Sequence, residues 1–432
     1  MHLVIIGNGV TGVSCAQAVR QLDAAARITI ISSESAHHYS RTALMYIFMG
    51  HLRYEHTKPH EDWYWAENRL ELIQAQATGL DTARQEITLD NGQTLAYDRL
   101  LLATGSRPRL ADWPGQHLRG VQGLYGLPDL EQMTRDTQGI RRAVVVGGGL
   151  IGIELAEMLH MRGIHVTQLV REGRYWAGIL PAEEAALVEK QIAEHHIDLR
   201  HHTELAELLA GPDGCVRAVR TTAGDELPAE WVGLAIGVVP NLALAQAGGL
   251  ETGRGILVDE LLQTSAPNVF AAGDCAQHRQ PGPGETDLEQ LWYTGRLQGQ
   301  CVGHTIAGRP TPYRRGVWFN SAKFFNLEYQ TYGRVPAQTP EGEASFVWQH
   351  PGGRHLLRIN YRQDGPQAVT GMNALGLRQR HDVWERWLRE GASISSVLKN
   401  LGQANFDPEF FRRHEKDIRR QFQERRPQPL AR

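Results

Sequence analysis

Cysteine is scarce in this sequence. The 432 residues include only four cysteines, and no two of them form a CxxC pair. Secreted domains held together by disulfides need more cysteines at closer spacing. The sequence therefore disfavours that class of protein and predicts a reducing, cytoplasmic location. The four cysteines are Cys15, Cys215, Cys275 and Cys301.

Long apolar runs and an excess of one charge are also missing. No stretch approaches the ~20 consecutive apolar residues that a membrane-spanning helix requires. Residues 2–6 read as a buried strand and carry no basic segment of the kind that begins a secretory signal. The formal net charge is only −3, which argues against a dedicated nucleic-acid binder. We therefore expect no membrane span, no secretory signal and no nucleic-acid partner.

Glycine, by contrast, is abundant and regularly spaced near the N-terminus. The stretch "HLVIIGNGVTGVSCAQAV" runs from an apolar strand through Gly7-x-Gly9-x-x-Gly12 into a helix of small residues. Such glycines allow a tight turn and let backbone N–H groups approach a pyrophosphate, whose charge the helix N-terminus favours. Glu34 follows the next strand, "RITIIS". It lies about 20 residues after Gly12, which is the separation expected for an acid that binds an adenosine ribose.

The same arrangement returns in "RRAVVVGGGLIGIELAEML", where Gly147, Gly149 and Gly152 lie between a valine-rich strand and a second helix. Two such units are hard to explain as coincidence, because each one requires its own strand, turn and helix. A chain of 432 residues is also long enough for two or three domains. We predict an α/β protein with two Rossmann-like units that bind two nucleotides.

Three further segments complete a recognisable order. "ITLDNGQTLAYDRLLLATGSRP" reads as a hairpin at Asn91-Gly92 followed by a strand that ends near Thr104 and Gly105. "GILVDELLQTSAPNVFAAGDCA" ends another apolar strand. The order GxGxxG, "ATGSRP", GxGxxG, "AIGVVPN", "VFAAGDCA" resembles the two-dinucleotide flavoprotein reductases of the pyridine nucleotide–disulfide oxidoreductase superfamily. The resemblance covers roughly residues 1–335.

The resemblance implies FAD in the first unit and NAD(P)H in the second. The FAD-binding domain would comprise residues 1–112 and 246–309, the NAD(P)H-binding domain residues 113–245, and an α+β interface domain residues 310–432. In isolation "AAGD" reads as a turn at a strand end, but together with the other motifs it implies a cofactor contact, in which Asp274 accepts a hydrogen bond from the ribityl chain. The cofactor-binding residues implied are Gly7, Gly9, Gly12, Glu34, Thr104, Gly105, Gly147, Gly149, Gly152, Gly237, Gly273 and Asp274.

The stretch "YSRTALMYIFMG", residues 39–50, carries no cysteine, although disulfide reductases of this superfamily have their redox cysteines near this place. The sequence therefore offers no thiol relay. It resembles instead the ferredoxin and rubredoxin reductases, the apoptosis-inducing-factor type and the flavoprotein part of NADH-dependent nitrite reductases. In that branch an arginine of this stretch lies near the flavin, which implies that Arg41 contacts the pyrophosphate or the flavin; a surface salt bridge is the alternative.

The implied reaction is hydride transfer from the nicotinamide to flavin N5, followed by electron transfer to an acceptor without a cysteine. Two residues are candidates for a catalytic role. Glu154, two residues after Gly152, would hold the nicotinamide carboxamide unless it is only a helix-surface glutamate. Trp292 would lie against the isoalloxazine or the nicotinamide, at the start of a helix whose N-terminus favours the charge of reduced flavin, unless it is a core tryptophan.

The identity of the nicotinamide coenzyme depends on the end of the strand "IHVTQLV". Val170 stands where an acid would bind the 2′-hydroxyl of NAD. Arg171 and Arg174 follow, and arginines here suit the 2′-phosphate of NADP, so the sequence favours NADPH. Glu172, which lies between the two arginines, would instead favour NAD, because its carboxylate could reach a ribose. The prediction is thus NAD(P)H with a preference for NADPH.

The last quarter of the chain predicts strands over residues 313–335, a hairpin around Gly352-Gly353 and a helix that includes Trp384 and Trp387. The basic C-terminal segment, residues 411–432, is either a solvated helix end or a docking surface for an acidic carrier. We expect electrons to pass to a small redox protein or a partner subunit, with a homodimer possible and no metal ligands. A diffusible acceptor such as quinone or oxygen, and a redox-responsive binding protein, are the alternatives.

Overall fold

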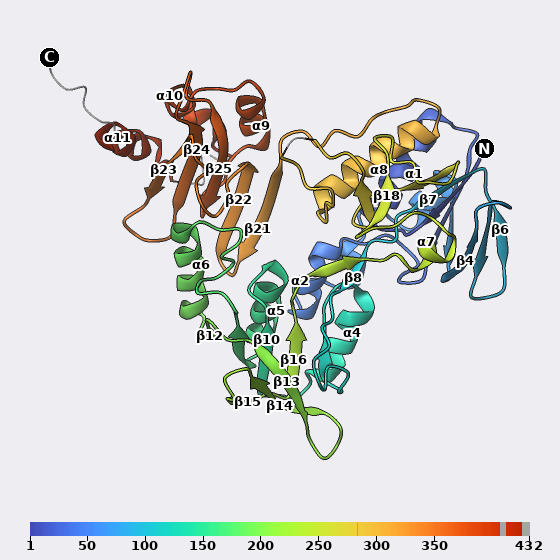
Figure 1. Ribbon diagram of the computed structural model, residues 1–432, viewed down its shortest axis with the longest axis horizontal. Helices are drawn as coiled ribbons and strands as arrows, with labels where there is room; N and C mark the ends of the chain where they lie inside the picture. Colours follow the sequence, from blue (N-terminus) through green and yellow to red (C-terminus); the bar gives the residue numbers. More distant parts are fainter. Residues whose placement is uncertain (283, 407–411, 426–432) are drawn as a thin grey trace. The chain divides into compact units, whose positions relative to one another are not determined.

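The computed structural model describes residues 1–282, 284–406 and 412–425 (Figure 1). The chain divides into two compact units. The first comprises Met1–Asp112, Gln116–Gly139 and Leu234–Arg315. The second comprises Trp113–Gly115, Ile140–Gly233 and Gly316–Arg432. Among the described residues, no helix has the length and apolar character that crossing a bilayer demands.

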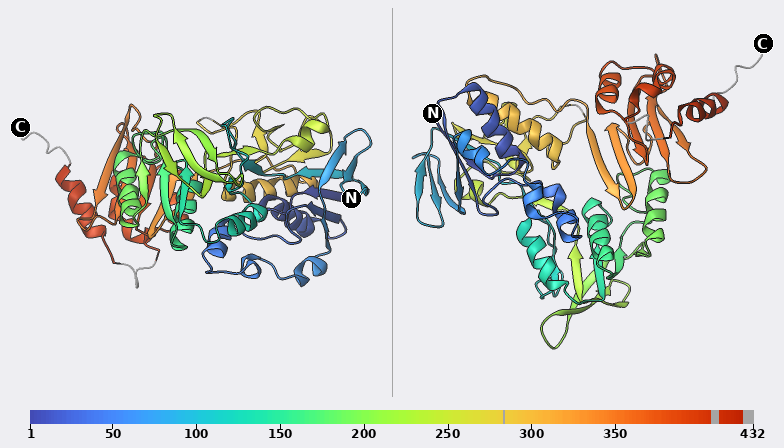
Figure 2. Two further views of the ribbon diagram at one scale, coloured as in Figure 1. Left: turned by 90° about the horizontal axis from the view of Figure 1, so that it is seen from below. Right: turned by 180° about the vertical axis from the view of Figure 1, so that it is seen from behind.

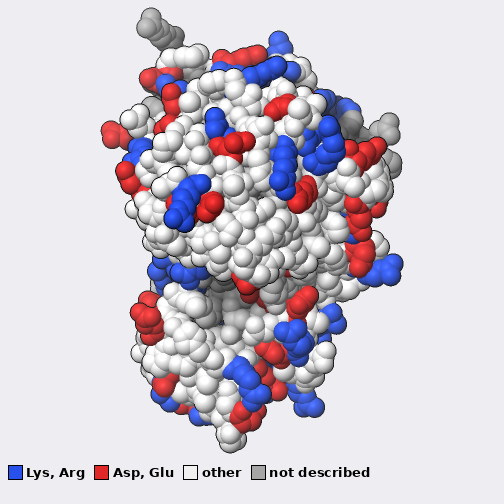
Figure 3. All heavy atoms as spheres, turned by 90° about the vertical axis from the view of Figure 1, so that its right-hand side faces the viewer, with Lys and Arg blue, Asp and Glu red and all other residues white. Residues whose placement is uncertain are grey.

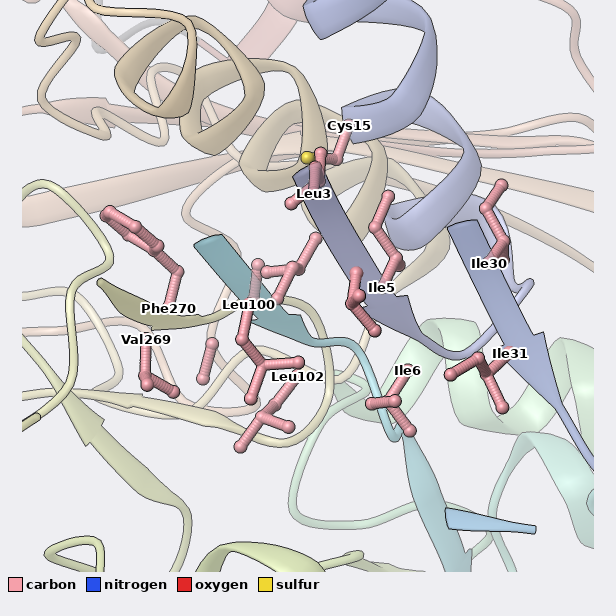
Figure 4. Close-up of a cluster of buried hydrophobic side chains, with 14 of the residues drawn as sticks. Leu3, Ile5, Ile6, Cys15, Ile30, Ile31, Leu100, Leu102, Val269 and Phe270 are labelled. Carbon is pink, nitrogen blue, oxygen red and sulfur yellow. The ribbon is translucent and has the colours of Figure 1, made fainter. Parts of the chain in front are cut away.

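A parallel five-stranded sheet forms the centre of the first unit, with the strand order β19-β7-β1-β2-β3. Its inner strands are almost continuously apolar, as expected for parallel strands covered on both faces. Ile5 lies in register with Ile30 on one side and Leu101 on the other, and Figure 4 shows these strands with their side chains packed together. The strands are β1 His2–Ile6, β2 Arg27–Ser32, β3 Leu70–Gln74, β7 Arg99–Leu102 and β19 Val269–Ala271.

Two helices of this unit, α1 (Val10–Leu22) and α8 (Trp292–Ile306), lie side by side (Figures 1 and 2). Their close approach depends on glycines in α8. A Cβ on Gly299 would stand 2.3 Å from the carbonyl oxygen of Thr11, and one on Gly303 would stand 2.8 Å from that of Cys15. Cys15 is fully buried in this core, as expected for a structural cysteine.

Shorter elements surround the central sheet of the first unit. The hairpin predicted at Asn91-Gly92 joins β5 to β6 in an antiparallel three-stranded sheet, β4-β5-β6. The strands are β4 Ala77–Asp81, β5 Glu86–Leu89, β6 Thr94–Ala96, β8 Ser106–Pro108, β9 Val121–Gln122, β17 Val238–Pro240, β18 Ile256–Val258 and β20 Ala276–His278. The helices are η1 Arg41–Ala43, α2 Leu44–Phe48, η2 Tyr54–Thr57, α3 Trp63–Glu67, α4 Leu127–Asp136 and α7 Ala243–Ala247.

The second unit begins with another strand–turn–helix arrangement. β10 pairs in parallel with β11, and β11 pairs in parallel with β12. The glycine turn then leads into α5, which packs on β10 and β11. The strands are β10 Arg142–Val146, β11 His165–Leu169, β12 Asp198–Arg200, β13 Leu205–Ala210, β14 Val216–Thr221, β15 Glu226–Pro228 and β16 Trp231–Leu234. The helices are α5 Leu150–Met161 and α6 Ala182–Glu194.

An antiparallel five-stranded sheet, β21-β22-β25-β24-β23, follows in the second unit. The predicted hairpin at Gly352-Gly353 joins β23 to β24. Trp384 and Trp387 of the predicted helix, α9, are buried in a core with Trp348. The strands are β21 Phe319–Phe324, β22 Leu327–Gly333, β23 Glu343–Gln349, β24 Leu356–Arg362 and β25 Val369–Leu375. The helices are α9 His381–Arg389, α10 Ile394–Lys399, η3 Leu401–Ala404 and α11 Glu415–Arg425.

The basic C-terminal segment is described only in part. α11 lies within it, whereas residues 411 and 426–432 lie outside the described residues. On the face of the molecule drawn in Figure 3, Lys and Arg side chains are interspersed with Asp and Glu side chains. This mixture agrees with the small net charge of the sequence.

Candidate functional site

A cavity of about 580 Å³ opens in the first unit. It lies at the carboxyl ends of the parallel strands β1, β2 and β7 and at the N-terminus of α1, the position at which α/β sheets usually bind ligands. Every residue that lines it belongs to the first unit. Eight of the candidates from the sequence are among them: Gly7, Gly9, Glu34, Arg41, Thr104, Gly105, Asp274 and Trp292.

The three glycines of the first turn have different structural roles. Gly7 has φ +114°, and a Cβ there would stand 2.2 Å from the carbonyl oxygen of Ala103. A Cβ on Gly12 would stand 2.1 Å from the carbonyl oxygen of Gly7. Gly9 has nothing within 4 Å of its Cβ position and provides no side-chain cap for α1. Gly7 and Gly12 thus shape the turn, while Gly9 leaves the helix N-terminus open to an anion.

Glu34 and Arg41 form one ion pair at the cavity wall. The Arg41 Nη2 atom donates to Glu34 Oε2 at 2.7 Å, and Nη1 donates to Oε1 at 3.0 Å. Glu34 Oε1 also accepts from the Tyr39 hydroxyl and from the backbone N–H of Leu127. Burial alone would raise the pKa of Glu34, but the charge and hydrogen bonds of Arg41 lower it below its ordinary value. The carboxylate therefore stays ionised and firmly oriented.

Tyr125 is a cavity residue that the sequence did not indicate. Its hydroxyl accepts from the Ser106 N–H at 2.8 Å and donates to Asp274 Oδ2 at 3.4 Å. The Arg41 guanidinium lies 4.4 Å from the centroid of its ring and donates to its carbonyl oxygen. Tyr125 thus connects the Glu34–Arg41 pair to Asp274. It stands in a loop before α4 with no motif around it, so no sequence signal could have found it.

Asp274 follows a glycine whose conformation is required. Gly273 has φ +79°, and a Cβ there would stand 2.5 Å from Thr11 Oγ1. The Gly273 N–H donates to the buried Gln298 Oε1 at 2.7 Å, which anchors the turn to α8. Burial raises the pKa of Asp274 against the opposing effects of Ser106, Arg41 and Tyr125. This carboxyl group is suited to accept a hydrogen bond from a bound hydroxyl.

The segments "ATGSRP" and "AIGVVPN" meet each other in the first unit. β8 and β17 pair antiparallel. Thr104 Oγ1 donates to the carbonyl oxygen of Asn241 at 2.8 Å, and the Asn241 N–H donates to the carbonyl oxygen of Gly105 at 2.9 Å. Gly237, with φ +105°, precedes this pairing. Asn241 also lines the cavity, and its place in the quoted motif was a signal that could have identified it.

Trp292 is the first residue of α8 and lines the same cavity. It is 36% exposed, so it is not a core tryptophan. The Arg296 guanidinium lies 5.7 Å from its ring centroid. Two residues before Trp292, Gln290 Nε2 donates to Ser106 Oγ at 2.8 Å. Both residues line the cavity and add polar groups to its wall.

The second glycine turn repeats the geometry of the first. Gly147 has φ +127°, and a Cβ on Gly152 would stand 2.4 Å from its carbonyl oxygen. Gly149, like Gly9, has nothing within 4 Å of its Cβ position. Gln168 Nε2 donates to the carbonyl oxygen of Gly147 at 2.9 Å, and the Tyr175 hydroxyl donates to that of Gly149 at 2.7 Å. The start of α5 therefore offers a second open helix N-terminus.

Glu154 lies one turn into α5 and is partly buried. Burial and the neighbouring Glu157 raise its pKa to about 7, while Lys323 opposes this change. Such a carboxyl group can change its protonation near neutral pH.

The two arginines proposed for the coenzyme phosphate differ in their contacts. Arg171 is 74% exposed and its Nε donates to Glu172 Oε1 at 2.7 Å. Arg174 is directed to backbone carbonyl oxygens, those of Ala177 at 3.2 Å and Leu180 at 3.4 Å. Arg171 is thus available to a ligand once its ion pair opens, whereas Arg174 supports the local turn.

None of the four cysteines forms a disulfide, and none lines the cavity. Cys275 is fully buried and its Sγ lies 3.4 Å from the carbonyl oxygens of Leu102 and Ala272. Burial raises the pKa of both Cys15 and Cys275. These thiols are protonated and structural, so the described cavity walls supply no sulfur nucleophile.

The chain is similar to known proteins in both sequence and structure. The model of the pyridine nucleotide-disulphide oxidoreductase family matches residues 1–299. The chain is 31% identical over 334 residues to rhodocoxin reductase of Rhodococcus erythropolis, covering 75% of this chain and 76% of that protein. It is 33% identical over 380 residues to the ferredoxin reductase component of a chlorobenzene dioxygenase from Cupriavidus sp. (strain PS12), covering 86% and 89%. A crystallised ferredoxin reductase from Rhodopseudomonas palustris matches with a TM-score of 0.79 and 25% identity, covering 87% of this chain and 91% of that one.

Proposed function

We propose that this chain, which belongs to the pyridine nucleotide-disulphide oxidoreductase family and is an FAD-dependent NAD(P)H oxidoreductase, passes its electrons directly to a small redox protein or a partner subunit. FAD supplies the two-electron chemistry when it is bound: it accepts a hydride from the nicotinamide and releases electrons onward. The residues of the chain bind and orient the two cofactors. The observation that carries the proposal is the cavity that begins at the first glycine turn and contains no cysteine.

The walls of that cavity fit FAD. The open N-terminus of α1 at Gly9 suits a pyrophosphate. The Glu34–Arg41 pair offers a carboxylate for ribose hydroxyls and a cation for a phosphate. Asp274, which accepts from the Tyr125 hydroxyl, would accept a hydrogen bond from the ribityl chain. Trp292, the first residue of α8, lines the cavity with an aromatic side chain beside a helix N-terminus.

The second unit is assigned to the nicotinamide coenzyme. Its glycine turn has the same open geometry at Gly149. Glu154 would hold the carboxamide of the nicotinamide. The division into an FAD-binding domain (1–112 and 246–309), an NAD(P)H-binding domain (113–245) and an interface domain (310–432) is also part of the proposal, although residues 116–139 and 234–245 belong to the first compact unit.

The names of the relatives support a protein acceptor. The relatives of the chain include a rhodocoxin reductase and ferredoxin reductases. Because the cavity contains no cysteine, electrons would leave the flavin without a disulfide. A steady-state assay with ferredoxin, rubredoxin, quinone and oxygen tests this point. Turnover that is fastest with either carrier protein supports the proposal, and faster turnover with quinone or oxygen would contradict it.

The functional assignment is tested by absorbance spectra. The purified protein should carry a yellow chromophore that bleaches anaerobically when NADH or NADPH is added. Replacing Glu154 by Gln should slow the bleaching about 10- to 100-fold, because the group that holds the carboxamide is changed, while FAD affinity changes less than about twofold. Glu390→Gln, an exposed change in the same unit, is the control. Equal loss of bleaching and of FAD would remove the role given to Glu154.

The preference for NADPH is tested at Arg171. Opening its ion pair with Glu172 would let the guanidinium bind a 2′-phosphate. Arg171→Ala is therefore expected to lower kcat/KM for NADPH about tenfold and to leave that for NADH nearly unchanged. The two values from the same preparation serve as each other's control. An unchanged NADPH-to-NADH ratio would show that Arg171 does not bind the phosphate.

A further inference from the structure

A second acidic residue and a lysine lie next to Glu154. Glu154 and Glu157 are one helical turn apart on α5 and therefore lie on the same side of the helix. Lys323 comes from β21, which also packs on α5. Its Nζ atom donates to Glu157 Oε1 at 2.5 Å. A residue far away in the sequence thus places a cation beside this acidic pair.

The charges of the three groups do not balance. Glu157 is 10% exposed and Lys323 is 31% exposed. The second oxygen of Glu157, Oε2, is buried and has no hydrogen-bond partner in the described structure. One ammonium group therefore faces two carboxyl groups. Two close carboxyl groups in such surroundings do not both ionise readily, and Lys323 is engaged directly by Glu157.

Among the described residues, Lys323 is the cation that acts on Glu154. On α5 itself, Glu157 acts on Glu154, and His160 interacts with Glu157. The turn after β11 contributes Tyr175, whose pKa Glu154 helps to raise. β10 and β11 also pack on α5, but the charged side chains that act on Glu154 are those of Glu157 and Lys323. The protonation of Glu154 thus depends on a balance between one like charge and one opposite charge.

We propose that Lys323 and Glu157 are positioning residues that set the protonation of Glu154 and thereby couple binding of the oxidised coenzyme to release of a proton. The inference rests on the proposed coenzyme site. Oxidised nicotinamide carries a positive charge and reduced nicotinamide does not. A carboxylate at Glu154 therefore attracts NAD⁺, whereas its protonated form does not. NAD⁺ should bind more tightly as the pH rises through the pKa of Glu154, which burial and Glu157 raise to about 7.

The experiment measures NAD⁺ binding to the oxidised, FAD-loaded protein by calorimetry between pH 5.5 and 8.5. No turnover occurs in this measurement. The wild type should show affinity that rises with pH around a midpoint, and Glu154→Gln should remove that rise. Lys323→Met removes the cation and should move the midpoint up by about 0.5–1 pH unit, whereas Glu157→Gln removes the like charge and should move it down by a similar amount. Lys190→Met, a lysine change on the exposed side of α6, should leave it in place.

Opposite shifts distinguish this role from a structural one. Damage to the fold would weaken binding in both variants without moving the two midpoints apart, and that result would overturn the inference. A pH-independent affinity in the wild type would overturn it as well. If Lys323→Met does not fold, the downward shift of the pH midpoint in Glu157→Gln still tests the inference. If the wild type binds no NAD⁺ but its flavin is bleached by NADPH, only this inference fails, whereas absence of bleaching by either coenzyme would reject the proposed function itself.

Discussion

Replacing Arg41 by methionine should weaken FAD binding about 100-fold, equivalent to about 2.7 kcal/mol. The change removes both hydrogen bonds to the Glu34 carboxylate, at 2.7 and 3.0 Å. It also removes the cation that contacts the ring and the carbonyl oxygen of Tyr125. Glu34 then faces the cavity as a poorly compensated charge next to a pyrophosphate. The Glu34 and Arg41 side chains are 23% and 32% exposed, so the loss should be smaller than for a fully buried pair.

The dissociation constant of FAD for the deflavinated protein, followed by fluorescence quenching, provides the measurement. Arg41→Lys keeps the charge but loses the two-pronged geometry, and should fall between wild type and methionine. Arg84→Met changes a 77% exposed arginine in the same unit and should bind FAD as the wild type does. If Arg41→Met bound FAD as tightly as Arg84→Met, Arg41 would be a surface salt bridge with no part in the site.

The local sequence predicted the turns and hairpins, because their backbone conformations require particular residues. Gly7 and Gly147 need left-handed φ values, and Gly12 and Gly152 need the absence of a Cβ, so their spacing could be read as two glycine turns. The hairpins at Asn91-Gly92 and Gly352-Gly353 follow from turn residues between apolar strands. In each of these cases the physical cause lies within a few residues of the pattern that reveals it.

Contacts between distant segments could not be predicted in this way. Tyr125 approaches Asp274 across 149 positions, and Lys323 approaches Glu157 across 166. Neither tyrosine nor lysine stands in a motif. The sequence indicated a cofactor contact for Glu34 and either a cofactor contact or a salt bridge for Arg41, but it did not identify Glu34 as the partner of Arg41. Such pairings depend on how the fold brings distant segments of the chain together, and local sequence patterns do not contain that information.

The largest effect on stability should come from Arg358→Met. Arg358, on β24, is buried, and its Nε donates to Glu184 Oε1 at 2.6 Å while its Nη2 donates to Oε2 at 3.0 Å. Glu184, on α6, is fully buried and otherwise accepts from Asn373 Nδ2 at 3.1 Å. Removing the arginine leaves a buried carboxylate with one amide donor. The free energy of unfolding of the second unit should fall by about 3–5 kcal/mol.

Urea unfolding, followed by the fluorescence of the buried tryptophans around Trp384, measures this loss. Arg354→Met removes a 70% exposed arginine that lies 3.8 Å from Glu194, so its effect should stay within about 0.5 kcal/mol. The double variant Arg358→Met/Glu184→Met removes both buried charges and should recover at least about 2 kcal/mol relative to Arg358→Met, because the carboxylate that still loses its arginine, Glu183, is 51% exposed. A double variant as unstable as the single one would mean that Arg358 acts through the packing of its side chain and not through its charge. The difference in free energy of unfolding between the double and the single variant therefore separates two explanations. Either each charge of the pair requires the other, or the sheet and α6 need the volume of the two side chains.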